Sequence, residues 1–189
     1  MKRIFIAIDI NSDNSMTDLF TLFRQELKDE RIRWVKPSNI HLTLAFLGDM
    51  DNQDIDSAKN IVSSTADKFK SFTLQWDCPG VFRDLNRPRV IWLGLKENRE
   101  LNKLREELCD KLRQAGLYSD TKAFSPHLTL GRMKFIKNRD KLAGLLEEGN
   151  VPLPHSQSVN EIVLYESILR QDGPEYVSLA KYPLKHPAP

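Results

Sequence analysis

One tetrapeptide occurs twice in this chain. His41-Leu42-Thr43-Leu44 recurs 86 positions later as His127-Leu128-Thr129-Leu130. Leucine and threonine suit a strand, in which residues two apart share a face. Each copy therefore presents a histidine and a threonine on one face and two leucines on the other. We expect the leucines to face a core and the two His-Thr pairs to face a cleft. Two imidazoles and two hydroxyls can bind and protonate a phosphate without a metal.

A structural interpretation competes with this one. The repeat could be a duplicated buried strand whose histidines only satisfy hydrogen bonds, because paired titratable groups also occur in purely structural settings. A short motif is weak by itself, but a second copy in a chain of 189 residues is informative.

The bulk composition excludes some classes of protein. The net charge of +2 is too small for a protein that coats nucleic acid, although it allows a basic patch confined to a cleft. Cys78 and Cys109 make neither a CxxC motif nor a zinc-ligand pattern, which favours a reducing, cytoplasmic location. The apolar run 4–10 is interrupted by Asp9 and reads as a strand, not a signal peptide. No run reaches the length of about 18 apolar residues that a membrane span needs.

Apolar periodicity predicts the order helix, motif strand, helix, strand, strand, and predicts it twice. The two copies cover about 13–95 and 98–182, within a single domain of residues 1–189. The first motif strand is expected to run from Ile40 to Leu47 and to stop at Gly48, and the second to run from Phe124 to Met133. Two further strands are expected over 72–76 and 90–95. The loop from Cys78 to Pro88 is long for a hairpin, carries arginines, and is therefore a candidate functional loop.

The flanks of the two motifs extend the pattern over nearly the whole chain. They are, in order, RIFIAID (3–9), RWVKPSNI (33–40), RPRVIWLG (87–94), FSPHLTLGR (124–132) and VLYES (163–167). Together with the doubled His-x-Thr-x motif, they closely resemble the RNA 2′,3′-cyclic phosphodiesterases, once called 2′-5′ RNA ligases, of the two-histidine phosphoesterase superfamily.

The resemblance implies an α+β fold of two pseudo-symmetric αβ lobes around a central cleft, each an antiparallel sheet with helices on its outer face. It implies hydrolysis of RNA or nucleotide 2′,3′-cyclic phosphate ends to 2′-phosphates. It also implies the roles of the histidines: His41 protonates the leaving O3′, and His127 activates water. Imidazole suits both tasks because it titrates near neutrality.

Four other residues are candidates for substrate binding. The hydroxyls of Thr43 and Thr129 can donate to the phosphoryl oxygens, and Arg132 can contact phosphate or stack on a base. Arg132 has the strand parity of the core, so we expect Gly131 to permit a bulge or a strand end that turns it back to the cleft. Phe46 also has core parity. It is either a base-stacking residue at the strand end or a plain core phenylalanine.

The remaining expectations complete the hypothesis. No cluster has metal-ligand spacing, so we expect neither metal nor cofactor, and we expect a monomer acting on RNA ends or cyclic nucleotides. His155 and His186 lie in Pro-rich segments and are expected to be surface residues. Two alternatives stay open: a 2′-5′ RNA ligase or 2′-5′ phosphodiesterase, and a non-catalytic module that binds RNA ends.

Overall fold

The computed structural model describes residues 1–11, 13–120, 123–147, 149–171 and 173–186. Its elements follow in chain order: β1 (Lys2–Asp9), α1 (Asn14–Glu26), β2 (Ile32–Trp34), a 3₁₀ turn (Pro37–Asn39), β3 (His41–Met50), α2 (Asn52–Ala66), β4 (Phe72–Leu74), β5 (Trp76–Phe82), β6 (Val90–Leu95), α3 (Arg99–Gln114), β7 (His127–Met133), α4 (Arg139–Leu146), β8 (Gln157–Val159), β9 (Glu161–Arg170) and β10 (Gly173–Pro183).

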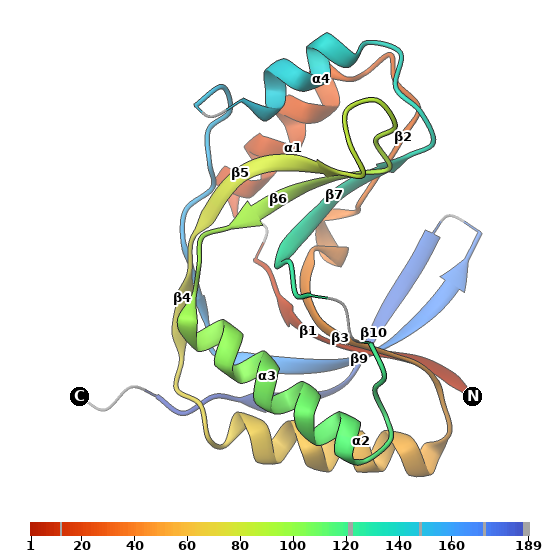
Figure 1. The fold of residues 1–189 in the computed structure, drawn as a ribbon, viewed down its shortest axis with the longest axis vertical. Coiled ribbons are helices and arrows are strands. Elements are labelled where there is room, and N and C mark those ends of the chain that lie inside the picture. Colours follow the sequence, from red (N-terminus) through yellow and green to blue (C-terminus); the bar gives the residue numbers. More distant parts are fainter. Residues whose placement is uncertain (12, 121–122, 148, 172, 187–189) are drawn as a thin grey trace.

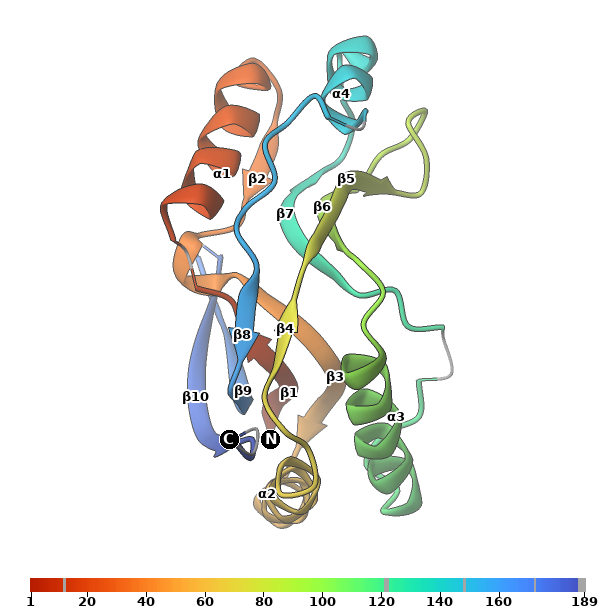
Figure 2. The same ribbon diagram turned by 90° about the vertical axis from the view of Figure 1, so that its left-hand side faces the viewer.

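Two four-stranded antiparallel sheets form two lobes. One sheet has the order β10-β9-β1-β3, and the other has the order β2-β7-β6-β5. Helices α2 and α3 lie beside the first sheet, whereas α1 and α4 lie beside the second (Figures 1 and 2). The predicted fold class, α+β with two αβ lobes, is confirmed. The strands β4 and β8 pair with each other between the lobes.

The two halves of the chain exchange elements between the lobes. In the first half, β3 and α2 belong to one lobe, while α1, β5 and β6 belong to the other (Figure 1). The second half reverses this assignment: β7 and α4 lie with the second sheet, while α3, β9 and β10 lie with the first. Each lobe is therefore built from both halves, and each receives one motif strand. A duplication with boundaries near 13–95 and 98–182 stays a prediction.

Side-chain caps and apolar stripes explain the helices. Each helix begins after a residue whose side chain accepts a hydrogen bond from the backbone N–H three residues later; these residues are Asp13, Asp51, Asn98 and Asn138. In α3, Leu101, Leu104, Leu108 and Leu112 are fully buried, as their helical spacing predicts. No helix in the described part of the chain is long and apolar enough to cross a membrane.

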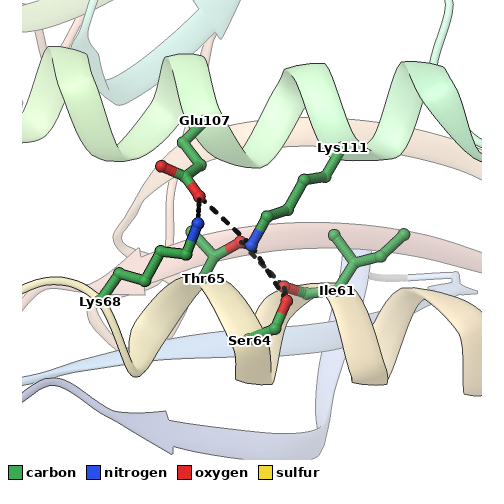
Figure 3. A network of polar contacts seen from close by, with 6 residues as sticks. All are labelled: Ile61, Ser64, Thr65, Lys68, Glu107 and Lys111. Carbon is green, nitrogen blue, oxygen red and sulfur yellow. Dashed lines mark hydrogen bonds and ion pairs between the residues drawn. The ribbon is translucent and has the colours of Figure 1, made fainter.

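A polar network joins α2 to α3 at the surface of the first lobe (Figure 3). The carboxylate of Glu107 pairs with Lys68 and lies 3.3 Å from the Lys111 ammonium. Lys111 also donates to the hydroxyl of Ser64 at 3.1 Å. The hydrogen bond from Lys68 is the largest of the contacts that lower the pKa of Glu107. These contacts hold the two helices together behind the sheet that carries β3.

Several of the predicted strand boundaries are wrong. The first motif strand does not stop at Gly48 but continues to Met50. Gly48 adopts a φ of +79° next to a β-bulge that omits Leu47 from the pairing with β1, so the strand passes through this glycine. The long loop from Cys78 to Pro88 is largely a strand. Residues 76–82 form β5, and the connection to β6 covers only 83–89. The expected strand over 72–76 is split between β4, which pairs with β8, and the start of β5.

Candidate active site

Each motif strand contains a β-bulge at the same place. The pairing of β3 with β1 omits Leu44, and the pairing of β7 with β6 omits Leu130, the fourth residue of each tetrapeptide. A bulge inserts one extra residue, so side chains beyond it change face. Phe46 and Arg132, two residues after the respective bulges, consequently lie on the same face as the His-Thr pairs.

This result decides between the alternatives for two residues. The predicted bulge next to Gly131 is confirmed, and it turns Arg132 to the cleft. Phe46 is not a core residue, because its side chain is 62% exposed. Nor does it lie at a strand end, since β3 continues four residues beyond it. The two bulges place an aromatic ring and a guanidinium at equivalent positions of the two copies.

One cavity between the lobes brings all six predicted residues together: His41, Thr43, Phe46, His127, Thr129 and Arg132. The same cavity is also lined by residues that the sequence did not single out: Arg33, Trp34, Val35, Lys36, Asn39, Gly173, Pro174 and Tyr176. These come from β2, from the turn that leads into β3, and from the β9–β10 hairpin. The two motif strands thus supply the centre of the cavity, and unrepeated segments supply its walls.

Both histidines are oriented by the same backbone contact. The Nδ1–H of His41 donates to the carbonyl oxygen of Asn39 at 2.8 Å, and the Nδ1–H of His127 donates to that of Ser125 at 2.7 Å. A carbonyl oxygen can only accept, so Nδ1 carries the proton in each ring. Nε2 is then the atom at which each histidine gains or loses a proton.

Aromatic rings surround both imidazoles. The ring of His41 lies 5.0 Å from that of Phe5 and meets Tyr176 edge-on at 5.1 Å, whereas His127 meets Phe82 edge-on at 4.5 Å. Burial among these rings disfavours the imidazolium and lowers the pKa of both histidines below the usual value. The guanidinium of Arg132 lowers both pKa values further. The hydrogen bonds to the two backbone carbonyls act in the opposite direction.

A carboxylate distinguishes the two histidines. Asp9 is the cross-strand partner of His41 and accepts a hydrogen bond from the hydroxyl of Tyr165. Its charge raises the pKa of His41, which opposes the effect of burial. The groups that shift the pKa of His127 include no carboxylate. Asp9 thus favours the cationic form of His41, whereas burial, Arg132 and His127 oppose it. The hydroxyl of Tyr165 holds this carboxylate in place.

The weaker candidates do not reach the cavity. His155 lies 3.8 Å from a carboxylate oxygen of Asp13 with a side chain 85% exposed, and His186 is exposed. Within the described residues, the arginines of the loop 83–89 do not line the cavity either. The described residues also include no group of three or more His, Cys, Asp or Glu residues placed to hold a metal ion.

Some of the missed residues left a signal in the sequence. Asn39 and Ser125 each precede a motif histidine by two positions, so the repeat could have indicated a shared local contact. Arg33 gave no such signal, because its place opposite Arg132 depends on the pairing of β2 with β7. Tyr176 likewise lies on a strand with no motif of its own.

Comparison with known proteins agrees with this geometry. Residues 18–168 match the model of the 2′-5′ RNA ligase superfamily. The chain belongs to this superfamily. A superfamily member from Methanothermobacter thermautotrophicus, named RNA 2′,3′-cyclic phosphodiesterase, is 32% identical over 184 residues, which cover 96% of this chain and 98% of the relative. A protein of the same name from Thermotoga maritima is 34% identical over 174 residues, covering 92% and 91% of the two chains.

Solved structures show the same fold. The structure of apo LigT from E. coli superimposes with a TM-score of 0.75 at 26% identity and covers 98% of both chains. TT0787 of Thermus thermophilus has a TM-score of 0.80 at 24% identity, covering 97% of this chain and 98% of that one. The two-lobed arrangement is thus shared with both solved structures over nearly the full length of the chain.

Proposed function

We propose that this chain is an RNA 2′,3′-cyclic phosphodiesterase that hydrolyses cyclic phosphate ends to 2′-phosphates by a metal-independent two-histidine mechanism. One observation carries the proposal: two histidines, each with Nδ1 bonded to a backbone carbonyl, line one cavity together with two threonines and an arginine. The names of the curated relatives support the reaction. Complexes of E. coli LigT with 3′-AMP and with phosphate support a nucleotide phosphate as the type of ligand.

The proposed step is an attack by water on the cyclic phosphorus. Neutral His127 accepts a proton from water at Nε2 as the P–O bond forms, and cationic His41 donates its Nε2 proton to O3′ as the P–O3′ bond breaks. The products are a 2′-phosphate and a free 3′-hydroxyl. Each histidine ends in the other's protonation state, and exchange with solvent restores both.

The charges near the histidines support this division of roles. Asp9 raises the pKa of His41 and favours the cation that an acid requires. Burial and Arg132 lower the pKa of His127, as a base requires; they also lower that of His41, so Asp9 is the charge that distinguishes the two. Thr43 and Thr129 are placed to donate hydrogen bonds to the phosphoryl oxygens, on which negative charge increases in the transition state.

Phe46 and Arg132 hold the rest of the substrate in this proposal. The exposed ring of Phe46 offers a face on which the base of the terminal nucleotide can stack. Arg132 offers a guanidinium to the phosphate, where a charge-assisted hydrogen bond is about twice as strong as a neutral one. Both side chains leave the core because of the bulge in their strand.

Substitution of the histidines tests the mechanism. His41→Ala and His127→Ala should each reduce turnover of a nucleoside 2′,3′-cyclic phosphate by about 10²–10⁴-fold. The double variant should be little worse than the worse single variant, because both groups act on one transition state. His155→Ala, which removes an exposed histidine, is the matched control. Near-wild-type turnover in either single variant would refute the pairing.

Product analysis and chelation separate this function from its alternatives. Chromatography against authentic 2′- and 3′-nucleotides should identify the 2′-phosphate, and a 3′-phosphate would reverse the leaving group and the roles. Turnover should survive a strong chelator, and loss that a divalent ion restores would contradict metal independence.

Joining or cleavage of 2′-5′-linked oligonucleotides would favour a ligase or 2′-5′ phosphodiesterase. Binding of RNA ends with no turnover would leave a binding module.

A further inference from the structure

Two guanidinium groups stand opposite each other at the edge of the cavity. In the pairing of β2 with β7, Arg33 is the direct cross-strand partner of Arg132. Directly paired residues of antiparallel strands project from the same face of the sheet, and both side chains line the cavity. Like charges in this arrangement destabilise a sheet unless an anion lies between or beside them.

The protein itself does not supply that anion. Among the described residues, neither Arg33 nor Arg132 forms an ion pair with a carboxylate. Some other strand cations are paired with carboxylates: Lys2 lies 2.8 Å from Glu166, and Arg170 lies 2.8 Å from Glu175. Arg33 and Arg132, which have no carboxylate partner among the described residues, thus lie side by side where β2 borders the cavity.

The proposed reaction uses only one of these two charges. A cyclic phosphate carries a single negative charge, and cationic His41 and Arg132 already oppose it. Arg33 adds a further positive charge that a cyclic mononucleotide does not need. An RNA chain does supply another negative charge, because the terminal nucleotide is joined to its neighbour through a 5′-phosphodiester.

The segment that carries Arg33 is held firmly against the motif strand. Trp34 and Ile32 pack over Gly131, where a Cβ atom would lie 2.9 Å from the Trp34 ring and 2.7 Å from Ile32. The Val35 N–H donates to the Leu130 carbonyl at 2.9 Å. Arg33 therefore projects from a fixed strand whose continuation, through the turn at 37–39, leads directly to His41.

From this arrangement we propose that Arg33 forms a second anion subsite, which binds the 5′-phosphate of the nucleotide whose 2′,3′-cyclic phosphate is being opened. The proposal rests on the function proposed above. It makes the preferred substrate the end of an RNA chain rather than a free cyclic mononucleotide, since only the former always carries a 5′-phosphodiester.

The sharpest test uses one nucleoside 2′,3′-cyclic phosphate with and without a 5′-phosphate, so that the two substrates differ only in the group in question. The measured quantity is the ratio of their kcat/KM values. The wild-type protein should prefer the 5′-phosphorylated substrate, and Arg33→Gln should reduce the ratio about tenfold or more, the value of one charge-assisted hydrogen bond. The change should appear in KM, and the preference should weaken as salt is added.

Arg31→Gln is the matched control. Arg31 lies two positions before Arg33, is exposed and does not line the cavity, so its substitution removes the same charge outside the proposed subsite. It should leave the ratio unchanged. A ratio that Arg33→Gln does not alter would overturn the subsite and make Arg33 a solvated charge on an edge strand. Equal losses on both substrates would also overturn it, since Arg33 would then act at the reacting phosphate. If the wild-type protein hydrolyses neither substrate, the function itself fails, which is a separate result.

Discussion

The Leu44 carbonyl group, on the outer edge of β3, gives a prediction about stability. In the second lobe, the equivalent carbonyl of Leu130 accepts from the backbone of Val35, next to β2. No strand of the described chain pairs with the outer edge of β3. Arg105 of α3 takes that place: its Nε–H donates to the Leu44 carbonyl at 3.2 Å, and its guanidinium lies 4.4 Å from the ring centre of Phe124. We expect Arg105→Met to destabilise the fold.

The size of the effect follows from these contacts. A hydrogen bond from a charged donor contributes about 1.5–3 kcal/mol, and loss of this one leaves the buried carbonyl with only the weak thiol donor of Cys109, 4.0 Å away. The contact with Phe124 adds about 0.5–2 kcal/mol, the range for exposed to desolvated cation–π pairs. Methionine keeps most of the aliphatic stem, so little packing is lost. Arg105 is partly exposed, so we expect a total of about 2–4 kcal/mol.

Urea unfolding followed by circular dichroism measures this loss, provided that the slope of the unfolding free energy against urea stays constant. Arg24→Met on α1 is the matched control. Arg24 donates to the Val35 carbonyl at 3.2 Å, but it is exposed and lies 5.8 Å from the ring of Phe20. Its loss should cost less than about 1 kcal/mol, as for other exposed polar contacts. Equal costs for the two variants would refute the reasoning, because the Leu44 carbonyl would then need no guanidinium.

Further predictions concern the pH dependence of turnover and the glycines of β7 and α4. Turnover against pH should follow a bell, because the productive state combines one neutral and one cationic histidine. Arg132 lowers the pKa of both His41 and His127, so Arg132→Gln should raise both pKa values and move the bell to higher pH; an unmoved bell would contradict this. Gly131→Ala should cost about 1–3 kcal/mol of unfolding free energy, since its Cβ would overlap the side chains of β2. Gly144→Ala, with open space in α4, should instead stabilise by up to about 1 kcal/mol.

The centre of the site was predictable because it depends on local periodicity alone. Alternation within a strand is enough to put His41 and Thr43 on one face, and the repeat is enough to pair them with His127 and Thr129. The predicted bulge at Gly131 also followed from a local conflict, since Arg132 was charged and had core parity. At Phe46 the same parity left two alternatives open, because a phenylalanine with core parity is unremarkable in a sequence and gives no conflict to resolve.

The errors arose where tertiary contacts override local preference. Cys78, Pro79 and Gly80 read as the start of a loop, but they lie in β5, an edge strand of the second sheet. Proline is tolerated in an edge strand, where its missing N–H needs no partner. Gly80 is required there because a Cβ atom would lie 2.3 Å from the ring of Trp92. Neither condition can be deduced from the residues in that segment.

The departures from symmetry matter most for function. Two identical motif strands related by a pseudo-twofold axis would accept a substrate in either of two orientations, with the roles of the histidines interchanged. Phe46 and Arg132 occupy equivalent positions with opposite chemistry, and Asp9 lies beside only one of the two histidines. In the proposed function, base and phosphate are therefore drawn to different sides of the cavity. Asp9 raises the pKa of His41 and does not act on that of His127, so in the proposed function the orientation of the substrate and the direction of proton transfer have a common origin.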